Sequence, residues 1–220
     1  YPGAFPDNAG PRLTEIGRQV FGEALSRPGV KAFWWPRFLD VVAWFVAEEN
    51  ARRNAGWRTL ATEGVGAMTI AAPAGAFRLT AKADRIDCDA SGRLVILDYK
   101  TGVPPSEPQV ASGLAPQLPL EAAIALAGGF DHVPTAEIAE LAFLRLRGGA
   151  EPGERVALVK QPPAELAARA LAGLARLVAM FDRPATPYRS RPRPQFVGRF
   201  SDYDHLARVK EWATGEAGET

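Results

Sequence analysis

The feature that most constrains the fold is a buried-strand pattern that ends in charged residues. Leu94 to Leu97 form a continuous apolar run, which is typical of a strand buried on both faces of a sheet. Asp98 and Lys100 follow directly, and Tyr99 lies between them. Because side chains two apart on a strand share a face, the acid and the amine point the same way and the tyrosine points the other way. The acid should therefore lie at the edge of the core, partly shielded from water.

A partner strand is expected immediately upstream. Residues 77–87 and 93–100 have the composition of two strands, and residues 89–92 between them suit a tight turn. A hairpin closed at this turn places Asp84 opposite or nearly opposite Asp98. Two carboxylates about 4 Å apart repel by roughly 4 kcal/mol at an effective dielectric of about 20, so a compensating charge is needed. A divalent cation would supply it, and oxygen ligands suit Mg²⁺, with Mn²⁺ as a substitute.

Two interpretations of this pattern stay open at this level. In the first, Asp84 and Asp98 hold Mg²⁺ at a phosphodiester, and Lys100 orients the attacking water or stabilises the charge that develops on phosphorus. In the second, Asp98 and Lys100 form only a salt bridge, and the upstream acids are solvated near a turn. A regular strand would point Asp87 to the face opposite Asp84, so Asp87 has a supporting role, paired with Arg85 or a nearby backbone group.

The remaining pattern predicts a mixed sheet flanked by helices. Apolar residues at helical spacing indicate helices at residues 13–25, 36–53, 117–127, 164–181 and 202–212. Alternating or continuous apolar runs indicate strands at residues 57–63, 66–71, 77–87, 93–100, 138–146 and 155–160. A Pro-rich loop is expected at residues 103–108. The fold class is therefore α/β (α+β), with a central mixed β-sheet and helices packed on it.

Composition excludes several classes of protein. The formal net charge of +1 argues neither for nor against a nucleic-acid partner. The single cysteine, Cys88, cannot build a disulfide framework or a zinc knuckle, and no iron–sulfur cluster is expected. A reducing cytoplasm is the predicted location. No stretch reaches the roughly 18 apolar residues of a membrane span, and no phosphate-binding loop of an ATP-driven motor is present.

Three segments, residues 83–87, 97–102 and 116–121, together resemble the RecB-like branch of the PD-(D/E)xK nuclease superfamily. They read Ala-Asp-Arg-Ile-Asp, Leu-Asp-Tyr-Lys-Thr-Gly and Pro-Gln-Leu-Pro-Leu-Glu. That branch has an Asp at a strand end, then an Asp-Tyr-Lys strand, then a helix led by Gln. The segments look most like the nuclease domains of the AddB family, which are parts of bacterial helicase–nucleases that process double-strand breaks for recombination.

The resemblance implies a restriction-endonuclease-like core with a defined site. In that site Asp84 and Asp98 would be metal ligands, and Lys100 would be the catalytic lysine. Gln117 would support the site or touch DNA, and the carbonyl of Tyr99 would face the metal. The implied activity is Mg²⁺-dependent, exonuclease-type hydrolysis of DNA in the bacterial cytoplasm. The implied partners are DNA, an AddA-like subunit and the rest of a longer chain.

Other charged residues are weaker candidates for the site. Glu63 would be a third acid near the metal if it closes the strand before the hairpin, although a solvated turn acid is the simpler interpretation. Contacts to DNA are expected from the arginines Arg85, Arg189, Arg191 and Arg193. For the last three, an arm packed over the domain is the alternative. Residues 1–182 are predicted to form the nuclease core, and residues 183–220 an Arg- and Pro-rich arm with a C-terminal helix on the same domain.

The chain departs from the RecB-like pattern in two places. The family carries a His on a helix upstream of the first Asp, whereas the only histidines here, His132 and His205, are downstream. We therefore expect the core to lack the family's first helix. Glu121 stands where a Tyr is common in the family. The alternative function is accordingly a catalytically silent DNA-binding or scaffolding domain of the same complex.

Overall fold

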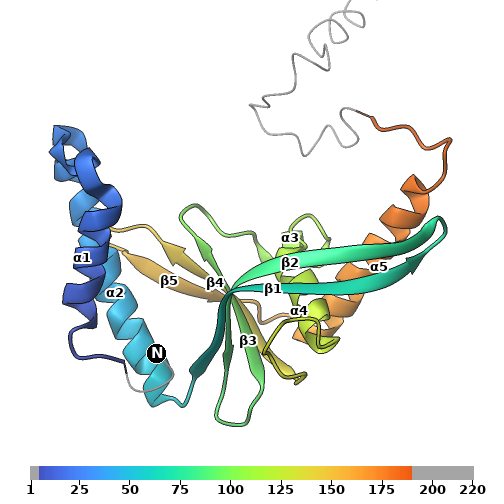
Figure 1. The fold of residues 1–220 in the computed structure, drawn as a ribbon, viewed down its shortest axis with the longest axis horizontal. Coiled ribbons are helices and arrows are strands. Elements are labelled where there is room, and N and C mark those ends of the chain that lie inside the picture. Colours follow the sequence, from blue (N-terminus) through green and yellow to red (C-terminus); the bar gives the residue numbers. More distant parts are fainter. Residues whose placement is uncertain (1–4, 190–220) are drawn as a thin grey trace, which may run out of the picture. The chain divides into compact units, whose positions relative to one another are not determined.

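A computed structural model describes residues 5–189 of the chain, which divides into two units, Tyr1–Ala179 and Met180–Thr220. In the described part of the first unit, helices pack on a five-stranded sheet (Figure 1). The strands are β1 (Arg58–Ala72), β2 (Gly75–Cys88), β3 (Leu94–Lys100), β4 (Ile138–Leu146) and β5 (Gly153–Ala157). The α-helices are α1 (Ala9–Phe21), α2 (Trp35–Asn54), α3 (Glu107–Ala111), α4 (Gln117–Leu126) and α5 (Pro163–Phe181). Two short helices of other types, η1 (Gly22–Ser26) and η2 (Val30–Trp34), join α1 to α2.

The sheet is mixed, as the sequence predicts. Its strands lie in the order β1-β2-β3-β4-β5. Strands β3 and β4 are parallel, and the other neighbours are antiparallel. The parallel pair is connected through α3 and α4, since parallel strands need a long crossover. Because both strands run the same way, they end at the same edge of the sheet, and the charged residues that follow their apolar runs are brought together there.

The two faces of the sheet are covered by different helices. On one face, Ile96 and Phe143 pack with α4 side chains such as Ile124 in the larger core cluster. On the other face, Leu97 and Leu144 pack with aromatic side chains that include Trp44 of α2. The apolar run of β3 is completely buried, which agrees with the sequence prediction. Burial of each of these side chains stabilises the folded state by about 1.5–3 kcal/mol.

The turn between β2 and β3 is the one that the sequence predicts. The N–H of Gly92 donates to the carbonyl of Asp89 at 3.0 Å, and Gly92 has a φ of +82° that glycine adopts without strain. The Asp89 side chain closes the turn by accepting the backbone N–H groups of Ser91 and Arg93, each at 2.9 Å. This turn fixes the hairpin register in which Cys88 pairs with Leu94.

Three elements differ from the sequence prediction. The strands expected at 57–63 and 66–71 are one strand, β1, which pairs with β2 along its whole length. The Pro-rich loop contains the short helix α3, which begins with a capping box between Ser106 and Gln109. The fifth strand ends at Ala157, earlier than expected. The helix predicted at 202–212 lies outside the described residues.

Residues 127–130 fix the end of α4 against β1. The N–H of Ala67 donates to the carbonyl of Gly129 at 2.9 Å, and Gly66 forms a β-bridge with Phe130. A Cβ on Gly129 would lie 2.2 Å from the carbonyl oxygen of Ala67, so only glycine fits this approach. The helix that carries part of the candidate site is therefore held to the sheet at its far end as well. Over the described residues, no helix has both the length and the apolar character needed to cross a membrane.

Candidate active site

Two aspartates and a lysine meet on one face of the sheet, at the end of β3. The hairpin register pairs Arg85 with Leu97 and, continued by one residue, places Asp84 of β2 opposite Asp98. The Oδ2 atom of Asp84 accepts the backbone N–H of Tyr99 at 2.8 Å. The Nζ atom of Lys100 lies 2.6 Å from Oδ2 of Asp98, which is only 1% exposed. The juxtaposition on which the nuclease interpretation depends is thus present in the structure.

Helix α4 adds two polar side chains to this face. The Oε1 atom of Gln117 accepts a hydrogen bond from Nζ of Lys100 at 3.3 Å. The Nε2 atom of the same amide donates to Oε1 of Glu121 at 3.2 Å, one helical turn later. Glu121 is 2% exposed, and its Oε2 atom has no hydrogen-bond partner among the described residues. Asp98, Lys100, Gln117 and Glu121 therefore form a connected chain of polar groups.

This cluster holds more carboxyl groups than one ion pair requires. Burial raises the pKa of Asp98, and the nearby Asp84 raises it too, while Lys100 acts in the opposite direction. Burial raises the pKa of Glu121 to about 7, with further contributions from Asp98 and Asp84. Three carboxyl groups share one ammonium group. A simple salt bridge at a strand end, the second interpretation above, leaves this surplus unexplained.

The donor set fits a divalent cation. Carboxylate oxygens are the ligands that Mg²⁺ and Mn²⁺ prefer in proteins, and a dication would offset the surplus charge of Asp84 and Asp98. Within residues 5–189, no three His, Cys, Asp or Glu side chains stand close enough to hold a metal together. The two aspartates would therefore be the carboxylate ligands, and the remaining positions would fall to water, a backbone carbonyl or substrate oxygens.

Sequence reasoning missed one basic residue beside the lysine. In the parallel pairing of β3 with β4, Arg145 is the partner of Lys100, so both side chains leave the same face. The Nη1 atom of Arg145 lies 3.8 Å from an Oε atom of Glu154, which is largely exposed. The Nε atom of Arg145 is buried without a hydrogen-bond partner in the described part of the chain. No sequence motif marks Arg145, because the signal lies in which strand pairs with β3.

The opposite face carries a buried ion cluster, formed by Glu49, Arg52, Arg85 and Asp87. Asp87 is 0% exposed and accepts from Nε of Arg85 at 2.7 Å and from Nη2 of Arg52 at 2.8 Å. Arg85 also donates to Glu49 of α2, and the hydroxyl of Tyr99 lies 3.5 Å from its Nη1. Pairing of Asp87 with Arg85 was expected from the sequence. The expected DNA contact of Arg85 is not supported, because its side chain is enclosed between β2 and α2.

The other predicted residues lie apart from the cluster. Glu63 has a φ of +53°, and its largely exposed carboxylate pairs with Lys82 at 2.6 Å. Glu63 is therefore a solvated acid paired with a residue of β2, and it does not contact the two aspartates. Arg189 is exposed and belongs to the second unit. Arg191 and Arg193 lie outside the described residues.

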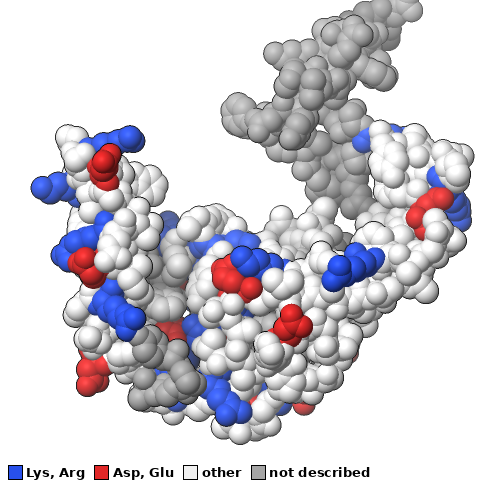
Figure 2. All heavy atoms as spheres, viewed as in Figure 1, with Lys and Arg blue, Asp and Glu red and all other residues white. Residues whose placement is uncertain are grey.

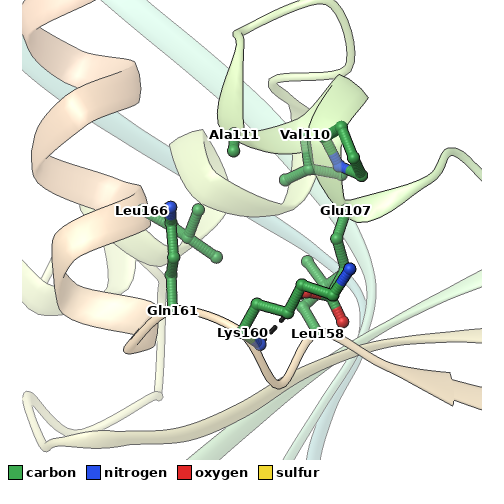
Figure 3. A pocket seen from close by; sticks show the side chains of 8 residues that line it. Glu107, Val110, Ala111, Leu158, Lys160, Gln161 and Leu166 are labelled. Carbon is green, nitrogen blue, oxygen red and sulfur yellow. Dashed lines mark hydrogen bonds between the residues drawn. The ribbon is translucent and has the colours of Figure 1, made fainter.

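A separate pocket lies between α3, the segment after β5 and the start of α5 (Figure 3). Leu158, Val110 and Leu166 give it an apolar lining. At its rim, the carboxylate of Glu107 accepts the backbone N–H groups of Val159 and Lys160, each at 3.1 Å. The pocket contains none of the residues that the sequence predicts for catalysis, and Glu107 is occupied by these two bonds. Its position is thus consistent with structural packing.

Comparisons with known proteins identify the family of the domain. The sequence profile of the PD-(D/E)XK nuclease superfamily matches residues 7–194, which include the hairpin and α4. Helices α1 and α2 also lie within the match, and neither carries a histidine. The predicted absence of the family's first helix is not tested by these findings and stays a prediction.

Individual relatives add little about the reaction. Over 119 residues, 54% of this chain, an uncharacterized protein of Rickettsia bellii is 27% identical and one of Rickettsia felis is 33% identical. The aligned region spans only 14% of each of these relatives, so the chain corresponds to a small part of their length. A solved structure titled "Crystal structure of SSO0001" covers 75% of this chain and 69% of its own, with 11% identity and a TM-score of 0.33.

Proposed function

Because this chain belongs to the PD-(D/E)XK nuclease superfamily, we propose that it hydrolyses phosphodiester bonds in DNA with the help of a divalent cation. The observation that carries the proposal is the meeting of Asp84, Asp98 and Lys100 on one face of the β2–β3 hairpin. The surplus of carboxyl groups there supports a cation at the same place.

Each side chain has a distinct part in the proposed reaction. Asp84 and Asp98 would hold the cation, which when bound supplies Lewis-acid polarisation of the phosphodiester and a lower pKa of a water. Lys100, 31% exposed in its side chain, can present its ammonium to the phosphate and stabilise the charge that develops on the phosphate oxygens. Asp84 is oriented by the backbone N–H of Tyr99, so its carboxylate needs little rearrangement.

The wider role that we propose is that of an AddB-type nuclease domain. Such a domain would cleave DNA strands delivered by a helicase, with an AddA-like partner subunit, during processing of double-strand breaks. Support comes from the three sequence segments that resemble the AddB family. A catalytically silent DNA-binding or scaffolding domain is the second candidate, favoured by the lack of a histidine upstream of Asp84 in this sequence and, within residues 5–189, of a third side chain placed to ligate a metal.

Replacing Lys100 with alanine tests the catalytic role directly. Loss of a positioned charge at the transition state is expected to lower kcat by about 10²–10³-fold, with a smaller effect on KM. The measurement is Mg²⁺-dependent cleavage of end-labelled single-stranded and double-stranded DNA. Lys160→Ala is the matched control, because Lys160 is exposed and lies at the separate pocket. Unimpaired cleavage by the Lys100 variant would remove the proposed catalytic role of Lys100, whereas absence of cleavage in the wild type would support the silent alternative.

A phosphate contact by Arg145 is the second expectation at this site. On the face shown in Figure 2, Lys and Arg side chains are scattered among Asp and Glu side chains and form no continuous basic patch there. Arg145 lies beside Lys100 and has a long ion pair with the largely exposed Glu154, which a bidentate phosphate would readily replace.

Arg145→Ala is therefore expected to weaken DNA binding by about 10–100-fold, since a hydrogen bond to a charged group contributes about 1.5–3 kcal/mol. Fluorescence anisotropy with Ca²⁺ in place of Mg²⁺ measures binding without turnover. The slope of log Kd against log salt concentration should also decrease, by the amount that corresponds to about one phosphate contact. Arg147→Ala is the control, because Arg147 follows β4 and already pairs with Glu151. Equal binding by both variants would exclude a specific contact by Arg145.

A further inference from the structure

Glu121 is a buried acid that the proposed reaction does not yet use. It lies on α4, one turn after Gln117, and is 2% exposed. Its environment disfavours the charged form, since burial and the nearby Asp98 and Asp84 raise its pKa to about 7. One of its oxygens accepts from Gln117, and the other has no hydrogen-bond partner in the described part of the chain. An apolar residue at this position would destabilise the fold less than a buried acid does. The presence of the acid therefore indicates a function in the site.

The contacts of Gln117 suggest that role. Its amide has one accepting end and one donating end, whereas an ammonium only donates and a carboxylate only accepts. The amide lies between these two groups, with its oxygen 3.3 Å from Nζ of Lys100 and its nitrogen 3.2 Å from Oε1 of Glu121. Without the carboxylate, only the ammonium would oppose rotation about the last side-chain bond, which brings the NH₂ group toward Lys100 so that two donors face each other. Glu121 therefore helps to select the orientation in which Gln117 holds the lysine.

This selection matters most when Asp98 is engaged elsewhere. The described partners of the Lys100 ammonium are Asp98 and Gln117. If the carboxylate of Asp98 serves a cation, its hold on the ammonium weakens, and the carbonyl of Gln117 becomes the main group that positions Lys100. Glu121 orients that carbonyl, because it accepts the hydrogen bond that the NH₂ end of the same amide donates.

We propose that Glu121 is a positioning residue, which fixes the Lys100 ammonium at the scissile phosphate by orienting the Gln117 amide. The expected effect of Glu121 on catalysis rests on the proposed nuclease function, but the positioning of Lys100 by Gln117 and Glu121 can be tested without turnover.

Two substitutions at Glu121 separate positioning from packing. Glu121→Met keeps the volume but removes the acceptor, whereas Glu121→Gln keeps an oxygen that can still accept from Gln117. Loss of an orienting partner behind an active-site group typically costs 10–100-fold, so the Met variant is expected to lose about that factor in kcat with little change in KM. The Gln variant is expected to stay within about threefold of the wild type, as rescue by a conservative change.

Thermal unfolding of the same proteins excludes a purely structural explanation. Both variants remove a carboxyl group whose charged form is disfavoured by burial, so both are expected to unfold at or above the wild-type temperature at pH 8. A structural role predicts that activity follows stability in both variants, whereas positioning predicts that only the Met variant loses kcat. Glu165→Gln, an exposed acid on α5, is the control. A kcat of the Met variant within twofold of wild type would overturn the proposal.

A second measurement keeps the proposal testable if the wild type does not cleave DNA, an outcome that counts against the proposed function alone. Acetylation of Lys100 by an amine-reactive ester, followed by peptide mass spectrometry in the presence of Ca²⁺, reports how firmly the amine is held. Its modification rate is expected to rise about fivefold or more in the Met variant and to change little in the Gln variant. The exposed Lys160 should react equally in all three proteins. Equal Lys100 rates in all three would refute positioning by Glu121.

Discussion

Replacing Asp98 with asparagine is expected to reduce metal-dependent DNA cleavage by about 10³-fold or more, which corresponds to roughly 4 kcal/mol of transition-state stabilisation. Asparagine has the same shape as aspartate but carries no charge, so the variant keeps the packing of a residue that is 1% exposed. It removes one of the two carboxylates that would hold the cation, and an amide oxygen is a much weaker ligand for Mg²⁺.

The metal dependence of this variant separates the two candidate functions. Isothermal titration with Mn²⁺ or Mg²⁺ should show binding to the wild type and a strongly weakened affinity for Asp98→Asn. Asp131→Asn, in an exposed loop, should behave like the wild type in both cleavage and metal binding. If Asp98→Asn binds the metal as tightly as the wild type does, the two aspartates are not its ligands, and the silent DNA-binding domain becomes the better interpretation.

The central part of this site could be predicted from sequence because it depends on local rules. Strand alternation assigns Asp98 and Lys100 to one face, and the turn at residues 89–92 fixes the register that brings Asp84 beside them. The same rule bears on Arg85. Arg85 is adjacent to Asp84 and points to the opposite face, where it is buried and paired with Glu49 of α2, so the structure does not support the expected DNA contact of its side chain.

Other parts of the site depend on packing between distant elements and were not predictable in this way. Arg145 joins the site only because β4 pairs in parallel with β3, with Arg145 in register with Lys100. Glu121 was recognised as a departure from the family pattern, but its burial against the aspartates follows from how α4 docks on the sheet. Local sequence patterns give the type of an element more readily than its neighbours, because neighbours are set by the whole core.

Replacing Asp87 with alanine is expected to destabilise the domain by about 3–5 kcal/mol, because it leaves buried positive charge without its counter-ion. Asp87 accepts from both Arg85 and Arg52, and those bonds join β2 to α2. In a domain of this size the loss corresponds to a fall in Tm of roughly 10 °C. Glu151→Ala, which removes an exposed partner of Arg147, should change the free energy of unfolding by less than about 0.5 kcal/mol.

The pH dependence of this effect has a definite sign. Burial alone would raise the pKa of Asp87, but the hydrogen bonds and charges of Arg85 and Arg52 outweigh burial and lower it. A carboxyl whose pKa is lowered by folding stabilises the native state above its unfolded pKa, near 4, and loses that contribution as the pH falls through the folded pKa. The difference in stability between wild type and Asp87→Ala should therefore be largest from neutral pH down to about 5 and should shrink in more acidic solution.

Activity of the folded Asp87 variant decides whether the buried ion cluster also belongs to the catalytic apparatus. Its side chains lie on the face covered by α2, while Asp84, Asp98 and Lys100 lie on the other face of the same strands. At a temperature where the variant is fully folded, kcat should consequently remain within about threefold of the wild type. A large loss of kcat without a loss of stability would mean that Arg85 and Tyr99 transmit the position of α2 through the sheet to the aspartates, and Asp87 would then be a supporting residue of the reaction itself.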